Sequence, residues 1–154
     1  MTEPQARTTE SDWRRHIVES SQRIREVLMG TKRIAVLGIK RESYQPAYFV
    51  PQYAQRAGYD VIPVPVYYPQ ATEMLGQPVY RSVADIPGDI DMVNVFRRAE
   101  SIPAHLDDII AKQPKTVWFQ SGIRNDAAAE RLARAGIDVV QDRCLLVELR
   151  QMGR

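Results

Sequence analysis

Residues 33–46 read RIAVLGIKRESYQP, an apolar run that stops at Gly38 and gives way to a polar loop. The apolar run predicts a strand over Arg33–Leu37 that is buried on both faces. Pro46 suits the first position of a helix, which we expect to continue to Ala57. Free N–H groups and the helix dipole point out of such a helix start. A strand, a glycine loop and a helix therefore form an anion site that suits a phosphate.

The glycine loop admits a second interpretation. Residues 38–43 read GIKRES, so the loop lacks the second and third glycines of the Gly-x-Gly-x-x-Gly dinucleotide fingerprint. No Gly-Lys-Ser/Thr follows, so it is not a Walker phosphate loop either. An ordinary strand-to-helix turn, which is common in α/β folds, explains the same residues equally well. The choice between the two depends on the rest of the chain.

The composition is that of one globular domain. The chain has 154 residues, of which 44% are hydrophobic and 26% are charged, enough for a sizeable core. Its 21 Lys and Arg residues are interleaved with 19 Asp and Glu residues, which leaves a net charge of +2. Because proteins that bind nucleic acid usually gather their basic residues on one face, we expect no nucleic-acid partner.

The N-terminus and the cysteine content narrow the class of protein further. Residues 1–10 are polar, so we expect a disordered tail without a signal peptide, followed by one domain over residues 11–154. No run approaches the roughly 18 apolar residues of a membrane span. Cys144 is the only cysteine, which excludes an internal disulfide and a zinc site built on paired cysteines. These features predict a cytoplasmic protein with no membrane partner and no metal site.

The remainder of the chain alternates between helical and extended patterns. A leading helix is predicted over residues 11–29, with Ser11 as its N-cap. Further strands are predicted over residues 59–64, 91–96, 116–119 and 137–140, and further helices over 101–112, 126–134 and 143–150. The alternation predicts an α/β fold: a single Rossmann-like, doubly wound parallel sheet with helices on both faces, plus the leading N-terminal helix.

Local signals refine three of these segments. Asn125 is a good N-cap for the helix over residues 126–134. Pro63 and Pro65 remove two backbone donors, so the second strand is expected to fray near its end. Residues 66–86 read as an irregular connection that holds a brief edge strand at 78–81.

In a doubly wound sheet the ligand lies beyond the carboxyl ends of the strands, where the strand order reverses. The loops that follow the five strands, residues 38–43, 64–68, 96–98, 120–124 and 142–144, therefore form the candidate site. Three of them carry cations that can converge on phosphates: Lys40, Arg41, Arg97, Arg98 and Arg124. Each arginine taken singly is also explained as a solvated surface residue.

The end of the second strand argues against NAD. An NAD-binding fold places Asp or Glu there to accept hydrogen bonds from the adenosine ribose. This chain has Val64-Pro65-Val66 instead. A hydrogen bond to a charged group contributes about 1.5–3 kcal/mol, so its loss would weaken NAD binding strongly. A ligand with a pyrophosphate and an adenine but a different ribose fits better, and coenzyme A (CoA), with its 3′-phosphate, is one.

Six segments together resemble the small bacterial and archaeal CoA-binding protein family. They are residues 33–38 (RIAVLG), 58–64 (GYDVIPV), 75–80 (LGQPVY), 95–98 (VFRR), 117–123 (VWFQSGI) and 139–144 (VVQDRC). The resemblance covers residues 32–149. This family is similar to the CoA-binding half of the succinyl-CoA synthetase α subunit. It implies a Rossmann-like domain that holds CoA or an acyl-CoA across the point where the strand order reverses.

The resemblance also implies roles for individual residues. It puts the CoA phosphates on the first glycine turn, at Gly38, Ile39, Lys40 and Ser43. It puts the adenine beside Val64 and Pro65, the pyrophosphate or the pantetheine arm near Phe96 and Arg97, and the thiol end near Gln120, Gly122 and Ile123.

The chain departs from the family after the second strand. The family usually has Val-Asn-Pro and a basic residue there, whereas residues 64–69 read VPVYYP. Tyr67 or Tyr68 either replaces the missing contacts by stacking on the ligand or simply covers the core.

The sequence offers no catalytic constellation. The synthetase uses a phosphorylated histidine from a second domain, which we do not expect in this chain, and we expect His16 and His105 to be structural or solvent-facing. The leading hypothesis is a protein that binds CoA or an acyl-CoA without catalysis. The alternatives are an NAD(P)-dependent oxidoreductase, a ligase subunit that acts with a separate catalytic chain, and a scaffold that keeps the fold without the ligand.

Cys144 lies near the expected start of the last helix, beside Arg143. Such a setting lowers the pKa of a thiol, and a thiolate near CoA could form a mixed disulfide. The alternative is a buried cysteine that acts as a small apolar side chain.

Overall fold

The computed structural model describes residues 12–154, in which five parallel strands form one sheet. The strands are β1 (Arg33–Leu37), β2 (Asp60–Val64), β5 (Met92–Val95), β6 (Thr116–Phe119) and β7 (Asp138–Val140). Their spatial order is β2-β1-β5-β6-β7. The predicted parallel α/β fold is confirmed, and the strand bounds differ from the predicted ones by at most one residue at each end. The predicted tail at residues 1–10 and the predicted cap Ser11 lie outside the described residues.

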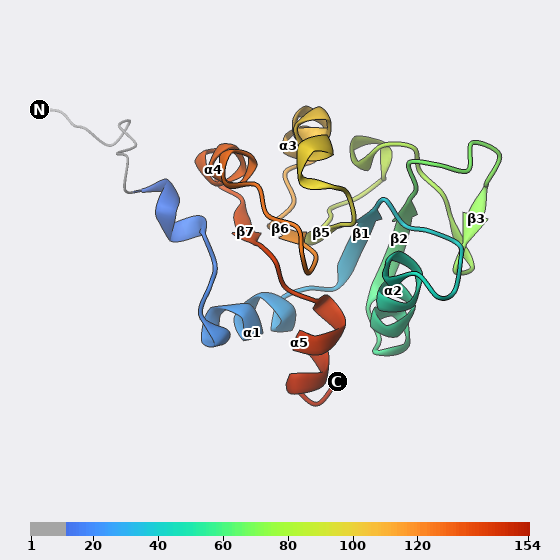
Figure 1. Ribbon diagram of the computed structural model, residues 1–154, viewed down its shortest axis with the longest axis horizontal. Coiled ribbons are helices and arrows are strands. Elements are labelled where there is room, and N and C mark those ends of the chain that lie inside the picture. Colours follow the sequence, from blue (N-terminus) through green and yellow to red (C-terminus); the bar gives the residue numbers. More distant parts are fainter. Residues whose placement is uncertain (1–11) are drawn as a thin grey trace, which may run out of the picture.

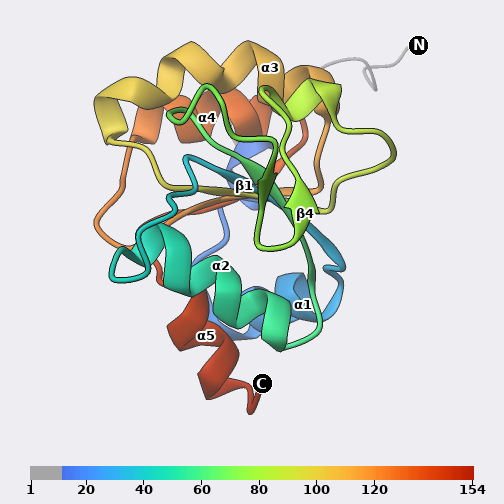
Figure 2. The same cartoon turned by 90° about the vertical axis from the view of Figure 1, so that its right-hand side faces the viewer.

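Helices cover both faces of the sheet (Figure 1). One face carries α1 (Ser21–Met29), α2 (Pro46–Arg56) and α5 (Leu145–Gln151), and the other carries α3 (Leu106–Lys112) and α4 (Asp126–Arg134). Figure 2 shows α2 and α5 side by side below the sheet and α3 and α4 together above it. Within residues 12–154 no helix is long and apolar enough to cross a membrane.

The strand side chains alternate between two apolar cores. Ile34 of β1 packs into the lower core with α1, α2 and α5, whereas Ala35 packs into the upper core with α3 and α4. In β6, Trp118 and Phe119 are both 0% exposed and belong to the lower and the upper core respectively. Burial of each large apolar side chain stabilises the fold by roughly 1.5–3 kcal/mol, so both faces contribute to holding the sheet.

The leading segment differs from its prediction. The expected single helix over residues 11–29 is wrong in its first half: a 3-10 turn over Trp13–His16 is followed by an extended stretch at Ile17 and Val18. Val18 N donates to Val139 O at 2.8 Å, so this stretch pairs with the outer edge of β7. The free backbone groups of an edge strand attract such pairing, and helical spacing in the sequence does not report it.

The helix α1 itself starts at Ser21. Ser20 is its N-cap and accepts a hydrogen bond from Arg23 N at 3.2 Å. Gly30 ends the helix as predicted. Asn125 likewise caps α4 as predicted, and its side chain accepts from Ala128 N at 3.0 Å.

The second strand does not fray at Pro63. β2 lies at an edge of the sheet, and Pro63 pairs with Val36 within the strand. The carbonyl of Pro63 faces outward and accepts from Tyr80 N at 3.1 Å. Since the N and the C=O of one strand residue point to the same side, the donor that proline lacks would not have bonded to β1.

The connection after β2 contains a small antiparallel hairpin, β3 (Glu73–Met74) with β4 (Gln77–Pro78). Its turn has Leu75 and Gly76 at φ 53° and 73°. The edge strand predicted over residues 78–81 overlaps the observed β4 at Pro78 alone, and a 3-10 turn over Val83–Asp85 follows it.

The helix predicted over residues 101–112 is a composite. A 3-10 segment over Ala99–His105 leads into α3. Pro103 lies in the middle of this segment, where its missing N–H disfavours a regular α-helix. His105 is consequently held at the junction between the two helical forms.

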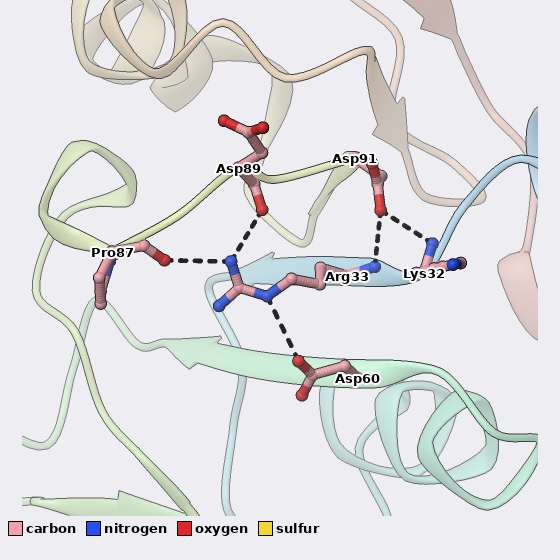
Figure 3. Close-up of polar contacts among 6 residues, drawn as sticks. All are labelled: Lys32, Arg33, Asp60, Pro87, Asp89 and Asp91. Carbon is pink, nitrogen blue, oxygen red and sulfur yellow. Dashed lines mark hydrogen bonds and ion pairs between the residues drawn. The ribbon is translucent and has the colours of Figure 1, made fainter.

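Polar contacts close the amino end of the sheet (Figure 3). The Asp91 carboxylate accepts from the backbone N of Lys32 and of Arg33, both at 2.9 Å. The Arg33 guanidinium donates to the carbonyls of Pro87 and Asp89 at 3.0 and 2.8 Å. Asp91 and Arg33 thus join the start of β1 to the segment that enters β5.

We expect Asp91→Asn to lower the free energy of unfolding by about 1 kcal/mol at neutral pH, because the amide keeps an acceptor but loses the charge. Burial alone would raise the pKa of the Asp91 carboxyl. The hydrogen bonds from Arg33 N and Lys32 N, with the charge of Lys115, outweigh burial and hold this pKa below its ordinary value. The stabilisation is therefore present above the ordinary pKa of Asp and is lost as the pH falls through the lowered one.

Urea unfolding at neutral pH and at about pH 3 measures this effect, since the second value lies below the ordinary pKa of Asp. The difference between wild type and Asp91→Asn should shrink at the lower pH. Asp89→Asn is the matched control, because the Asp89 side chain is exposed and points away from Arg33 in Figure 3. A difference for Asp91→Asn that is the same at both pH values would contradict the prediction.

Candidate functional site

The strand order reverses between β1 and β5, and the glycine turn follows β1 at that point. β2 pairs with one side of β1 and β5 with the other. Gly38 has φ 89°, and its N donates to Val64 O at 2.9 Å. A Cβ at this position would lie 2.4 Å from Phe96 O. Only glycine therefore allows the loops after β1 and β5 to approach each other this closely.

The glycine loop is anchored to the start of α2. Pro46 is the first residue of this helix, as predicted. Pro51 lies inside the helix and has no N–H to donate to the carbonyl of Ala47, four residues earlier. That carbonyl accepts from Lys40 N at 3.1 Å instead. A proline in the helix thus provides the acceptor that fixes the backbone of Lys40.

An open groove of about 520 Å³ lies at the carboxyl ends of β1, β5 and β6. The structure brings seven of the twelve predicted site residues to its wall: Lys40, Phe96, Arg97, Arg98, Gln120, Gly122 and Ile123. The start of α2 contributes Gln45, Pro46 and Ala47. The groove therefore joins the glycine turn, a helix N-terminus and the turns after two further strands.

The other five predicted residues lie outside the groove wall. Gly38 is beneath it, in contact with Phe96. Ile39 is buried in the lower core, Val64 in the upper core, and Pro65 is buried as well. Ser43 is exposed on the loop. The resemblance placed Val64 and Pro65 beside the adenine, but in this chain the end of β2 points them into the protein.

Two cations of the groove wall converge on Tyr67, a residue of the loop after β2. The Lys40 Nζ lies 4.8 Å from the centre of the Tyr67 ring, and the Arg97 Cζ lies 6.0 Å from it. A hydrogen bond with Arg97, supported by the charges of Arg97 and Lys40, lowers the pKa of the Tyr67 hydroxyl. We call Lys40, Tyr67 and Arg97 the cationic cluster.

The cationic cluster keeps its charge available for a ligand. Among the described residues, no carboxylate forms an ion pair with Lys40 or Arg97. Arg98, by contrast, has an 84% exposed side chain and lies 3.8 Å from Glu100. Lys40 and Arg97 are therefore the stronger candidates for binding an anion, because water and a carboxylate already screen Arg98.

Tyr68 covers the core, which is the second of the two roles that the sequence left open for Tyr67 or Tyr68. Its hydroxyl donates to Glu42 at 2.7 Å and accepts from Arg41 N at 3.3 Å. The hydrogen bond from Tyr68 lowers the pKa of the Glu42 carboxyl. The side chain of Tyr68 also packs against the lower core. Tyr68 thus fastens the loop after β2 to the glycine loop, whereas Tyr67 is 51% exposed and contacts the cations.

The side chain of Arg81 also fixes the loop after β2. The Arg81 guanidinium donates to the carbonyls of Tyr67 at 3.1 Å, Tyr68 at 2.5 Å and Ala71 at 3.1 Å. Tyr68 adopts φ 61°, a conformation that this set of bonds maintains. Arg81 therefore fixes the backbone that carries Tyr67 beside the groove.

The opposite wall of the groove is braced by the last two strands. Gln120 is 4% exposed, and its Oε1 accepts from Leu145 N at 3.3 Å. Gly122 N donates to Asp142 Oδ1 at 2.7 Å, which joins the turn after β6 to the turn after β7. One of these contacts is buried and the other is exposed, and together they hold Gln120 and Gly122 in place at the groove wall.

His105 is the site residue that the sequence did not indicate. It was expected to be structural or solvent-facing, and it makes a structural contact with a residue of the groove wall: its Nε2 accepts a hydrogen bond from Arg97 Nε at 3.2 Å. His16, the other histidine, lies 2.8 Å from Asp138, and that pair is at the amino end of β7. No sequence signal links residues 97 and 105, because the irregular 3-10 segment between them sets their distance.

Cys144 does not line the groove. It is the N-cap of α5 and packs against the lower core. The placement is that of a partly buried apolar side chain, and the mixed disulfide with CoA stays a prediction. In residues 12–154 no group of three or more His, Cys, Asp or Glu side chains could hold a metal ion.

The residues of the groove suit the chemistry of CoA. Lys40 and Arg97, with the N-terminus of α2, supply positive charge for phosphates. Phe96 and Ile123 supply apolar surface in the same groove, as an uncharged arm requires. The glycine turn lets the backbone come close to a bulky phosphate.

Comparison with known proteins agrees with this geometry. A family model described as a CoA binding domain matches residues 32–150. The uncharacterized protein YneT of Bacillus subtilis (strain 168) is 36% identical over 128 residues, which cover 83% of this chain and 93% of YneT. The solved structure of cell-free ID.343 from Thermus thermophilus is 38% identical with a TM-score of 0.80, over 87% of this chain and 99% of that one.

A larger protein shares the fold alone. The dinucleotide forming acetyl-coenzyme A synthetase 1 of Ca. Korarchaeum cryptofilum, solved with phosphate and ADP, has a TM-score of 0.63 and 19% identity. The match covers 74% of this chain but 26% of the synthetase. Since the family model spans most of the chain and YneT is well above 30% identical over most of it, the chain belongs to the family of CoA-binding domains.

Proposed function

We propose that this protein binds CoA or an acyl-CoA in the groove at the carboxyl ends of β1, β5 and β6, without catalysing a reaction on it. The main support is the approach of Gly38 to Phe96 O, which places a glycine turn, a helix start and two cations at the reversal of strand order. Ligands of doubly wound sheets bind at such a reversal. Membership of the CoA-binding family selects CoA among phosphate-containing ligands.

Each part of the groove has a role in this proposal. Lys40 and Arg97 would hold phosphates, and Arg97 has a planar guanidinium that suits bidentate contact. Tyr67, rather than Val64 or Pro65, is the side chain after β2 that a ligand would meet. Phe96 and Ile123 would lie along the pantetheine arm.

The absence of catalysis is part of the proposal and rests on the polar groups of the groove. Its wall has one carboxylate, Glu100, which lies 3.8 Å from Arg98. A general acid or base needs a partner or an environment that tunes its pKa toward neutrality. The described groove residues supply no such pair, since the nearby His105 is hydrogen-bonded to Arg97.

A ligase subunit that acts with a separate catalytic chain is the second candidate. The observation in its favour is that the chain matches about a quarter of the acetyl-coenzyme A synthetase, as a CoA-binding part would. In that case the protein alone should form no acyl-CoA from CoA, a carboxylic acid and ATP. Formation of acyl-CoA by the protein alone would contradict both candidates.

Calorimetric titration tests the proposal directly. We expect CoA and acetyl-CoA to bind, ADP to bind more weakly because it lacks the arm, and pantetheine to bind weakest because it lacks the phosphates. NAD should bind more weakly than CoA, because β2 ends without an acidic residue for the ribose. No binding at millimolar CoA would refute the proposal, and binding of NAD in preference to CoA would support the oxidoreductase alternative.

A further inference from the structure

The contact between Arg97 and His105 defines the protonation of the imidazole. Arg97 Nε lies 3.2 Å from His105 Nε2. A guanidinium has only donors, so the Nε2 atom must be the acceptor and must carry no proton. His105 is therefore neutral in this contact, with its hydrogen on Nδ1.

The surroundings of His105 favour this neutral form. Burial lowers its pKa most, the positive charge of Arg97 lowers it further, and the negative charge of Asp108 opposes them. The Asp108 carboxylate, in the first turn of α3, is engaged elsewhere, accepting from Val83 N at 2.7 Å and Ala84 N at 3.0 Å. Burial and the charge of Arg97 thus favour the neutral imidazole, the form that accepts from Arg97 Nε.

The contact determines which donors Arg97 can offer to a ligand. A guanidinium has five N–H donors in one plane. When Nε–H is bonded to His105, the four N–H bonds of the two terminal amino groups remain, and these make the bidentate contact with a phosphate. Arg97 lines the groove and its Cζ lies 6.0 Å from the centre of the Tyr67 ring, so the guanidinium lies at the groove wall beside Tyr67. The hydrogen bond also restricts a long side chain that would otherwise lose rotamer freedom on binding.

We propose that His105 is the positioning residue of this anion site: its imidazole holds the Arg97 guanidinium so that the two terminal amino groups face the phosphates of the ligand. The inference rests on the proposed function and assigns a role to a side chain outside the groove wall. It predicts that the effect of His105 on affinity passes through Arg97.

Two substitutions of His105 distinguish the effect of its hydrogen-bond acceptor from the effect of its side-chain volume. His105→Gln keeps an acceptor at a similar distance from the backbone, whereas His105→Leu keeps the bulk and removes the acceptor. Loss of one hydrogen bond of ordinary strength corresponds to about a three- to tenfold weaker affinity. We expect this loss for His105→Leu and near wild-type CoA affinity for His105→Gln, with thermal unfolding confirming that both variants fold.

The same His105→Leu change in an Arg97→Ala background makes the test specific. We expect it to change the CoA affinity by less than about 1.5-fold there, because the partner is gone. An equal loss in both backgrounds would show that His105 acts through packing alone, and would overturn the inference.

A measurement without ligand separates this inference from the proposed function. The Nε–H resonance of Arg97 in ¹⁵N-resolved NMR should be protected from exchange in wild type and His105→Gln, and lost in His105→Leu. If this pattern is observed but CoA does not bind, the proposed function is refuted, whereas the hydrogen bond between His105 and Arg97 is supported. If the resonance is unchanged in His105→Leu, the positioning of Arg97 by His105 is refuted, whatever the affinity for CoA.

Discussion

Replacing Gly38 with alanine is expected to weaken CoA binding about a hundredfold, because a Cβ there would lie 2.4 Å from Phe96 O and the two loops must separate. The same change should lower the free energy of unfolding by about 2–4 kcal/mol. Part of this loss comes from the positive φ of 89° and part from the overpacked contact. Calorimetry with CoA and urea unfolding measure the two effects separately.

Gly58→Ala is the matched control for this substitution. Gly58 has φ 105°, but a Cβ there would meet nothing within 4 Å, and it lies between α2 and β2 at the amino end of the sheet. It should cost about 1–2 kcal/mol of stability from backbone strain and change CoA affinity by less than about twofold. Equal losses of affinity in the two variants would show that binding follows global stability and not the turn at Gly38.

Arg97→Ala should weaken CoA binding by about 10–100-fold, which corresponds to the 1.5–3 kcal/mol of a hydrogen bond to a charged group. Arg97 lines the groove, pairs with no carboxylate among the described residues and contacts Tyr67 and His105. The remaining affinity should also depend less on salt, because one cation has been removed. Titrations at two ionic strengths measure both effects.

Arg98→Ala provides the comparison one residue away. Its guanidinium is largely in water and lies 3.8 Å from Glu100, so the loss of affinity should stay below about threefold. The free energy of unfolding should be nearly unchanged in this variant. If Arg98→Ala weakens binding as much as Arg97→Ala does, the ligand phosphates lie on the exposed side of this loop and not against the cationic cluster.

The sheet was predictable because its strands are buried on both faces. In Thr116–Phe119, for example, all four residues are buried and the last three are apolar, a pattern typical of parallel strands covered by helices. Helix ends with a specific chemical signal, such as Asn125, were also predicted correctly. In these places the local sequence and the tertiary structure favour the same conformation.

The errors occurred where a tertiary contact overrides local preference. Ile17 and Val18 fit a helical pattern but pair with Val139, because the edge of β7 has backbone groups to satisfy. The hairpin at residues 73–78 depends on a tight turn at Leu75 and Gly76, and its two-residue strands are too short to show an alternating pattern in the sequence. Neither outcome can be computed from spacing alone.

The site was predictable at the level of loops and less so at the level of side chains. Topology brings the turns after β1, β5 and β6 together, so Lys40, Phe96 and Arg97 were found by the rule for strand ends. Loop topology did not indicate which side chains after β2 are buried: Val64 lies in the core, whereas Tyr67 contacts Lys40 and Arg97 of the groove wall.

The proline inside α2 links the stability of that helix to the shape of the groove. A proline in a helix interior costs about 3 kcal/mol relative to alanine, so α2 is weaker than its length suggests. The carbonyl oxygen that α2 gives up holds the loop of Lys40. The carbonyl oxygen of Ala47 thus affects both the stability of α2 and the position of the glycine loop. Any substitution at position 51 chosen to make the protein more heat-resistant acts on the glycine loop at the same time.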